Sequence, residues 1–367
     1  MITIVIPLFL QQIIQLLIMS LLTIDFLETI YKQQKETSLH GKWIRFKDIK
    51  NLFEKYKALF EVTKIGSSEQ DIPIYQLKIG AGKKKILLWS QMHGNESTGT
   101  RALFDVFNCF LNSSEEEIKT ILENCTLVFI PMLNPDGAEV YTRVNGNNID
   151  LNRDAVNRVA KESKLLRSVL EDFNPQFCFN LHDQRTIFNV ENTKNTATIS
   201  FLAPSEEETR ALTKGRKETM NVIVAMNATL QKVIPNHVGR YTDEFYPTAT
   251  GDNFQKLGFN TILIESGHYP EDYIREESRK YTFYAILQGL FYIAETTDFS
   301  AYKDYFLIPN NAKDFYDVIH RYPNSKNDIA YQFKDQIIDN KLVSNLIKIE
   351  DEDIKGKIGL HEIVFGR

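Results

Sequence analysis

Residues 84–96 read KKILLWSQMHGNE, an apolar run of strand length that stops at a histidine and reaches a glutamate three residues later. Similar runs end at Asn134 (TLVFIPML), His182 (QFCFNL) and Glu265 (TILI). Between them lie helix-like segments, at 99–111, 154–173 and 206–230. Buried strands that alternate with helices indicate an α/β fold with a mixed, largely parallel central sheet and helices on both faces.

Three of the polar residues at these strand ends are suited to metal binding or acid–base chemistry. They are His93, His182 and Glu265. In open sheets of this kind, ligands bind beyond the carboxyl ends of the strands. We therefore expect the three side chains to share one site.

The spacing of His93 and Glu96 is typical of a metal clamp. An imidazole and a carboxylate with two residues between them can reach one ion from a single turn, and His182 is the natural third ligand. Three protein ligands leave one position open for water, which is the arrangement of catalytic zinc. An HxxE pair alone is a weak signal, but its combination with a second strand-end histidine and a strand-end carboxylate predicts a metal site here.

The two ends of the chain differ from this central pattern. No charged side chain precedes Asp25, and residues 2–17 are dominated by Ile and Leu. Three interpretations are open: the protein begins at Met19 and Met1 is an upstream start-site artefact, the segment is a signal or an anchor, or it is a packed helix. Beyond residue 300, short alternating stretches predict a small strand-rich module. We expect an N-terminal leader or helix (1–40), a catalytic domain (41–300) and a β-rich C-terminal module (301–367).

Composition narrows the class of protein further. The 367 residues carry a formal net charge of −5 and contain no long basic block, which argues against a nucleic-acid partner. Three cysteines are too few for a disulfide framework and favour a reducing compartment. We therefore expect a cytoplasmic protein. If residues 1–24 act as a signal or anchor, the protein would instead be secreted, periplasmic or membrane-anchored. The sequence gives no indication of oligomeric state.

Four ordered blocks carry a family resemblance: HGNEST (93–98), TRVNGNNIDLNRD (142–154), NLHDQ (180–184) and TILIESGHY (261–269). Through them the chain resembles the zinc carboxypeptidases, the funnelin-type metallocarboxypeptidases, over residues 41–297. The resemblance implies that His93, Glu96 and His182 bind one Zn²⁺ ion and that Glu265 is the general base.

The same resemblance implies roles for residues that would otherwise pass as surface polar groups. Arg143 would polarise the scissile carbonyl, and Asn152 and Arg153 would bind the terminal carboxylate of the substrate. A guanidinium suits both tasks, since it stabilises an oxyanion and holds a carboxylate through two hydrogen bonds. Tyr246, with Tyr241 as the competitor, matches the mobile tyrosine that the family places over its substrate.

Two further residues are secondary candidates. Asp183 could orient the imidazole of His182, although neighbouring side chains on a strand point to opposite faces. Asp252 could line the specificity pocket or be a solvent-facing turn residue.

Taken together, the sequence predicts a zinc-dependent metallocarboxypeptidase that hydrolyses the C-terminal peptide bond, or a related amide, with zinc-activated water and Glu265 as base. One alternative is a deacylase of small acyl-amino acids, similar to succinylglutamate desuccinylase or aspartoacylase. Another is a peptide-binding module without turnover. The expected partner is a peptide or an acyl-amino acid, and the preferred side chain cannot be read from the sequence.

Overall fold

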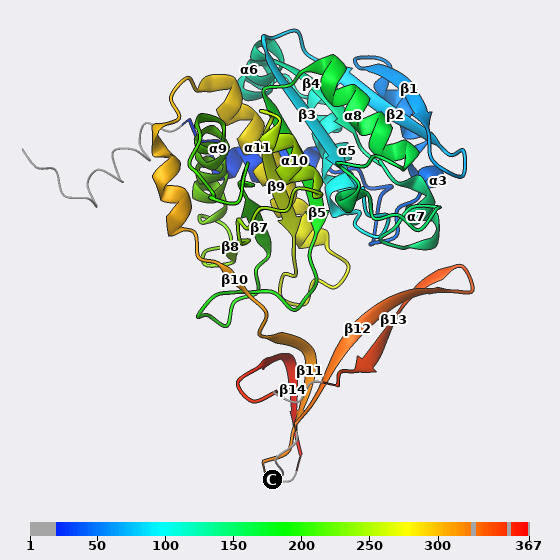
Figure 1. Ribbon diagram of the computed structural model, residues 1–367, viewed down its shortest axis with the longest axis vertical. Coiled ribbons are helices and arrows are strands. Elements are labelled where there is room, and N and C mark those ends of the chain that lie inside the picture. The colour runs from blue at the N-terminus through cyan, green and yellow to red at the C-terminus, as the bar shows by residue number, and fades with distance from the viewer. Residues whose placement is uncertain (1–19, 324–327, 351–353, 366–367) are drawn as a thin grey trace, which may run out of the picture.

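A computed structural model describes residues 20–323, 328–350 and 354–365, so the apolar run at 2–17 lies outside the described residues. An eight-stranded sheet forms the centre of the molecule, in the order β1-β2-β4-β3-β5-β9-β7-β8 (Figure 1). Its strands are β1 (Glu61–Ser67), β2 (Pro73–Ile79), β3 (Lys84–Ser90), β4 (Cys125–Ile130), β5 (Phe177–Asp183), β7 (Ile199–Leu202), β8 (Val238–Arg240) and β9 (Asn260–Ser266).

The four apolar runs recognised in the sequence are the central strands. β4, β3, β5 and β9 lie side by side and run parallel. Antiparallel pairing occurs in the β1–β2 hairpin, between β2 and β4, and between β7 and β9. The predicted mixed, largely parallel sheet is therefore confirmed, and the carboxyl ends of its central strands meet at one edge.

Helices cover both faces, as predicted. One face packs against α2 (Ile24–Gln34), α5 (Thr98–Asn112), α6 (Glu116–Asn124), α9 (Lys214–Leu230) and α11 (Glu276–Glu295). The other packs against α8 (Lys161–Phe173), α10 (Thr250–Lys256) and the 3-10 turn η1 (Leu151–Arg153). Because side chains alternate along a strand, β3 sends Leu88 into the first core and Trp89 into the second.

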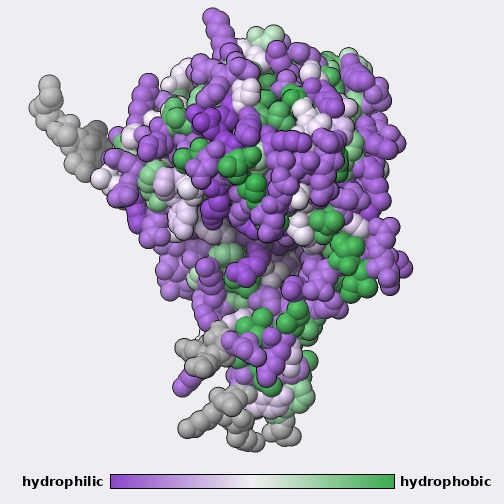
Figure 2. Space-filling model, turned by 45° about the vertical axis from the view of Figure 1, so that its right-hand side comes forward, coloured by the Kyte–Doolittle hydropathy of each residue, from purple (hydrophilic) through white to green (hydrophobic). Residues whose placement is uncertain are grey.

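A smaller four-stranded sheet follows the main body, in the order β13-β12-β11-β14. Its strands are β11 (Phe315–Arg321), β12 (Ile329–Ile338), β13 (Lys341–Lys348) and β14 (Ile358–Val364). β12 and β13 form a hairpin whose turn residues Asp339 and Asn340 both have positive φ, as a two-residue turn requires. In space-filling view this C-terminal sheet is a narrower extension of the larger body (Figure 2). The predicted strand-rich module is thus present, while its exact domain boundary stays a prediction.

Short elements connect these layers. They are α3 (Phe46–Ile49), α4 (Leu52–Tyr56), α7 (Pro135–Val140), η2 (Ser300–Leu307), β6 (Asn189–Val190) and β10 (Asn311–Ala312). β10 pairs with β6 and so ties the segment before the C-terminal sheet to the main body. Among the described residues, no helix combines the length and apolarity needed to cross a membrane.

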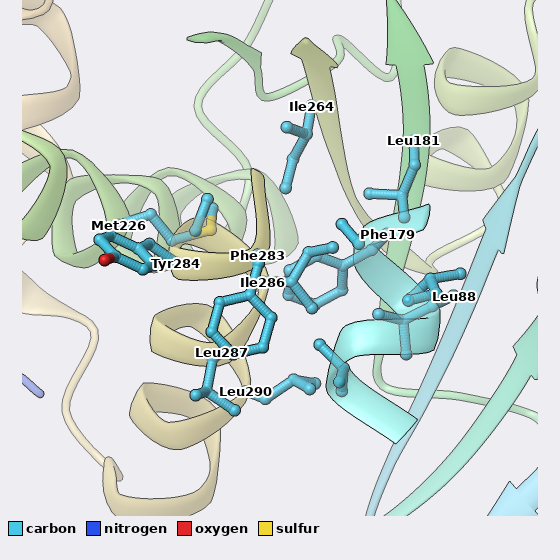
Figure 3. Close-up of a cluster of buried hydrophobic side chains, with 14 of the residues drawn as sticks. Leu88, Phe179, Leu181, Met226, Ile264, Phe283, Tyr284, Ile286, Leu287 and Leu290 are labelled. Carbon is cyan, nitrogen blue, oxygen red and sulfur yellow. The ribbon is translucent and has the colours of Figure 1, made fainter. Parts of the chain in front are cut away.

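Two predicted helices begin later than expected. The helix expected from residue 154 begins at Lys161, because the carboxylate of Asp154 accepts hydrogen bonds from the backbone N–H groups of Val159 and Ala160 and holds a turn there. The helix expected from residue 206 begins at Lys214, where the Thr213 hydroxyl caps its first turn. Both later starts lie outside the buried core. Leu88 and Phe179 of the sheet lie in the same buried cluster as Leu287 and Leu290 of α11 (Figure 3).

Candidate metal centre

His93, Glu96 and His182 converge beyond the carboxyl ends of β3 and β5. The Nδ1 atom of His93 lies 2.9 Å from Glu96 Oε1, and that of His182 lies 2.9 Å from Glu96 Oε2. The two Nδ1 atoms are 3.2 Å apart. The side chains are 2%, 11% and 2% exposed, so solvent scarcely reaches them. Within the described residues, this is the group of His, Cys, Asp and Glu side chains that could hold a metal ion.

The turn after β3 brings His93 and Glu96 to the same point. The backbone N–H of Glu96 donates to the His93 carbonyl at 3.0 Å. Gln91 stabilises the turn by donating from its side-chain amide to the carbonyl of Gly94. A Cβ atom at Gly94 would lie 1.9 Å from the backbone of Gly137, so only glycine fits there.

Glu265 stands beside this group because of strand register. It is the Cα partner of His182 in the parallel pairing of β5 and β9, so the two side chains point to the same side of the sheet. Its Oε2 atom is buried and has no hydrogen-bond partner. Burial, together with the negative charges of Glu96 and Asp183, raises the pKa of the Glu265 carboxyl well above its usual range. A buried carboxyl oxygen left free in this way is suited to exchanging a proton with a substrate.

Asp150 belongs to the site and was missed by the sequence analysis. Its Oδ1 lies 3.1 Å from Nε2 of His93, on the ring edge opposite the one that faces Glu96. Its Oδ2 accepts a hydrogen bond of 2.9 Å from Nε of Arg143. A carboxylate on the far nitrogen fixes the tautomer and orientation of a ligand imidazole. Asp150 is two residues before Asn152, inside the NIDLNRD block, but nothing in its spacing marks it as a partner of His93.

Asp183 does not have the orienting role suggested as a secondary hypothesis. Its carboxylate accepts hydrogen bonds from the backbone N–H and the hydroxyl of Thr98, at 3.2 and 2.7 Å. No contact joins it to the His182 ring among the described residues. The reason is the alternation of side chains along β5, which turns Asp183 away from its neighbour.

The three residues expected to act on the substrate lie at the mouth of the site. Nη1 of Arg143 is 3.4 Å from Glu96 Oε1 and 3.2 Å from His93 Nδ1. Asn152 and Arg153 lie on η1, where the Asn152 side chain accepts a hydrogen bond from the first residue of α10. Arg153 is exposed and forms no ion pair with any described residue. Its Nη1 donates to the Asn152 carbonyl at 2.7 Å, and because no described carboxylate neutralises its charge, its other N–H groups can bind an anion.

The two candidate lid tyrosines occupy different positions. Tyr246 is 56% exposed, and its ring lies 5.2 Å from the guanidinium of Arg153. Tyr241 instead lines the cavity over the metal group, and its hydroxyl donates to Gln184 at 2.7 Å. The lid role of Tyr246 stays a prediction, with Tyr241 as its competitor.

The environment of Asp252 agrees with neither expectation. Its side chain is buried rather than solvent-facing. It accepts a hydrogen bond from the backbone N–H of Tyr246 and does not line the cavity.

A cavity of about 630 Å³ opens over the metal group. Its wall includes Arg143, Asn152, Arg153 and Glu265 from the main body. The C-terminal sheet closes another part of the wall, with Asp317, Gln332, Phe333, Asp335 and Ser344. The volume is that of a site for a small ligand or for a few residues of a peptide.

Fold and site together define a class of protein: an α/β protein with a compact His-Glu-His group, suited to one metal ion, at the carboxyl edge of a mixed sheet. The chain belongs to the zinc carboxypeptidase family, whose sequence profile matches residues 47–263.

Individual relatives are distant. Carboxypeptidase SOL1 of Arabidopsis thaliana is 24% identical over 188 residues, which cover 46% of this chain and 38% of that protein. Carboxypeptidase D of Homo sapiens is 25% identical over 123 residues, 29% of this chain and 9% of that protein. The chain thus spans less than two-fifths of the length of these curated relatives.

Solved structures show the same fold. The carboxypeptidase A of Helicoverpa armigera matches with a TM-score of 0.54 at 15% identity, covering 74% of this chain and 80% of that one. A metallo-carboxypeptidase of Pseudomonas aeruginosa matches with a TM-score of 0.52 at 15% identity, covering 67% and 68%. At such identities the likeness concerns the fold alone.

Proposed function

We propose that the protein is a zinc-dependent metallocarboxypeptidase that hydrolyses the C-terminal peptide bond, or a related amide bond, of its substrate. One observation carries the proposal. The possible ligand atoms of His93, Glu96 and His182 meet beside Glu265, whose buried Oε2 has no partner, at the edge of the sheet where ligands bind. Membership of the zinc carboxypeptidase family supports this function over the deacylase alternative.

The donor set fits zinc. Two imidazole nitrogens and one carboxylate oxygen make up the three-ligand group of catalytic zinc sites, which keep a further position open. Zinc held there would supply a Lewis acid that activates water and polarises the scissile carbonyl. Asp150 would keep the His93 ring in place through its Nε2 atom.

The remaining chemistry falls to the chain's own side chains. Glu265 would take a proton from the attacking water and pass it to the leaving amine, a task that suits a buried carboxyl whose Oε2 has no other partner and whose pKa burial raises. Arg143 would stabilise the developing oxyanion. Arg153, without an acidic partner, and Asn152 would hold the terminal carboxylate and so restrict cleavage to the last residue.

The test is a library of peptides that differ in their last residue, incubated with zinc-loaded protein and analysed by mass spectrometry. We expect release of single C-terminal residues, loss of this activity with chelator, and its return with added zinc. Glu265→Gln should keep its zinc, measured by elemental analysis, and lose hydrolysis by roughly 10²- to 10⁴-fold.

Three results would contradict the proposal. Cleavage that is indifferent to chelator would exclude the metal mechanism. Hydrolysis of N-acyl amino acids without release from peptides would establish the deacylase instead. Binding of peptides with no turnover, in parent and variant alike, would identify a binding module.

A further inference from the structure

Five cationic side chains line the cavity: Lys42, Arg143, Arg153, Arg185 and Arg275. Two of them are neutralised by carboxylates. Lys42 forms an ion pair with Asp335 of β12. Arg143 forms one with Asp150, with 2.9 Å between Nε and Oδ2. The Lys42 charge is balanced by Asp335, and Arg143 already has its role in the proposed reaction, at the oxyanion.

The other three differ from one another. Arg275 is buried, and its guanidinium donates to the backbone carbonyls of Ser266 and Gln184 at 2.5 and 2.6 Å. Arg153 is the residue that would hold the terminal carboxylate. Arg185 remains, with an exposed side chain that forms no hydrogen bond or ion pair with any described residue. The cavity therefore offers one cation more than the proposed reaction uses.

The backbone on the N-terminal side of Arg185 is firmly held. The Gln184 N–H donates to the carbonyl of Ser266 at 2.9 Å. The Gln184 side chain donates to the Ala197 carbonyl at 2.5 Å and accepts from the Tyr241 hydroxyl at 2.7 Å. Together with the bond from Arg275, these contacts fix the residue that precedes Arg185.

The C-terminal sheet holds the other side. Gln332 of β12 donates to the Thr186 hydroxyl at 2.9 Å, and the N–H of Phe315 donates to the Ile187 carbonyl at 3.3 Å. A surface arginine on an unrestrained loop would lack such bonds on both sides. Arg185 thus has a fixed backbone and a free guanidinium, which lowers the entropy lost when that guanidinium binds a ligand.

We propose that Arg185 binds a second acidic group of the substrate, so that the protein prefers peptides with a carboxylate besides the terminal one. The inference rests on the proposed function. A planar guanidinium holds a carboxylate through two parallel hydrogen bonds, and an uncompensated cation inside a cavity attracts anions. The second carboxylate belongs to the side chain of the last residue or of the one before it.

The experiment compares kcat/KM for peptides that differ only by Glu or Gln, at the last position in one pair and at the position before it in another. The full chain loaded with zinc should prefer Glu by about tenfold or more at one of these positions, since hydrogen bonds between charged groups are that strong. Arg185→Gln should abolish the preference mainly through KM, and Arg185→Lys should retain part of it. The peptide pair whose Glu/Gln preference depends on Arg185 shows whether the bound carboxylate belongs to the last residue or to the one before it.

Lys119→Gln is the matched control. It removes one positive charge from an exposed position on α6, the helix that leads into the first residue of β4 and so lies away from the carboxyl ends of the strands. Its Glu/Gln ratio should equal that of the parent. Equal rates for Glu and Gln at both positions in the parent would overturn the inference, as would a preference that survives Arg185→Gln.

A binding measurement separates this inference from the proposed function. Zinc-loaded Glu265→Gln is titrated with the Glu and Gln peptides, with and without Arg185→Gln. Loss of the affinity difference in the double variant supports the role of Arg185 even if no peptide is hydrolysed, whereas an unchanged difference refutes it. Absence of hydrolysis alone counts against the carboxypeptidase proposal and not against Arg185.

Discussion

Replacing Asp150 by Asn tests how the proposed zinc site is supported. One carboxylate oxygen, Oδ1, faces His93 Nε2 at 3.1 Å and also accepts from the Asn152 N–H at 2.9 Å. The other, Oδ2, accepts from Arg143 Nε at 2.9 Å. An amide keeps a single acceptor, so its NH₂ group must face a donor on one side or the other. The His93 ring then loses either its orienting bond or the charge that strengthens that bond.

The expected cost is a roughly 10- to 100-fold weaker zinc affinity, which is the usual effect of removing a carboxylate behind a ligand histidine. This corresponds to about 1.4–2.8 kcal/mol of binding free energy. The assay is competition for zinc with a chromophoric chelator at fixed pH. Asp154→Asn is the control, because it makes the same charge change in the same loop, while among the described residues its carboxylate accepts hydrogen bonds only from Val159 and Ala160. A zinc dissociation constant for Asp150→Asn equal to that of this control would refute the reasoning.

Three other variants test stability and selectivity. Asp105→Ala removes the nearer carboxylate from the fully buried guanidinium of Arg279 and leaves only Glu276, at 3.5 Å, among the described residues, so the free energy of unfolding in urea should fall by about 3–5 kcal/mol. A loss no larger than that of a surface variant would contradict this. Burial raises the pKa of Asp252 from 3.8 to about 6, so the folded state holds the proton more tightly and should lose roughly 3 kcal/mol of stability as pH rises from about 4 to 6. Asp252→Asn should remove that loss. If the variant keeps the pH dependence of stability of the parent, Asp252 does not cause it. Gln332→Ala releases Thr186, and we expect a lower Glu/Gln preference with unchanged zinc affinity; an unaltered preference would show that this bond does not position Arg185.

Features set by local pattern could be predicted from the sequence. The central strands were recognised because each is a short apolar run that stops at a polar residue. Parallel strands bring such ends to one edge, and this is why His93, His182 and Glu265 could be grouped before their distances were known. Helix starts were less predictable, since one or two side-chain hydrogen bonds, from Asp154 and Thr213, decide them.

Long-range contacts could not be predicted. Asp150 and His93 are 57 positions apart, and their contact depends on how the loop after α7 folds back over the site. The ion pair of Lys42 with Asp335 spans 293 positions. The sequence pattern around Asp150 or Lys42 does not indicate which distant residue it contacts. For the same reason, the sequence revealed a strand-rich C-terminal module without showing that it forms part of the cavity wall.

The bond between Gln332 and Thr186 has a consequence for how the protein is made and how it could be altered. Domains form from the N-terminus during synthesis, so the residues assigned to hydrolysis are all present once Glu265 has emerged, before β11 and β12 exist. The loop that carries Arg185 gains its last restraints only from those later strands. In the proposed carboxypeptidase, a shuffled or redesigned C-terminal sheet would therefore alter which peptides are preferred, while the residues assigned to hydrolysis stay as they are.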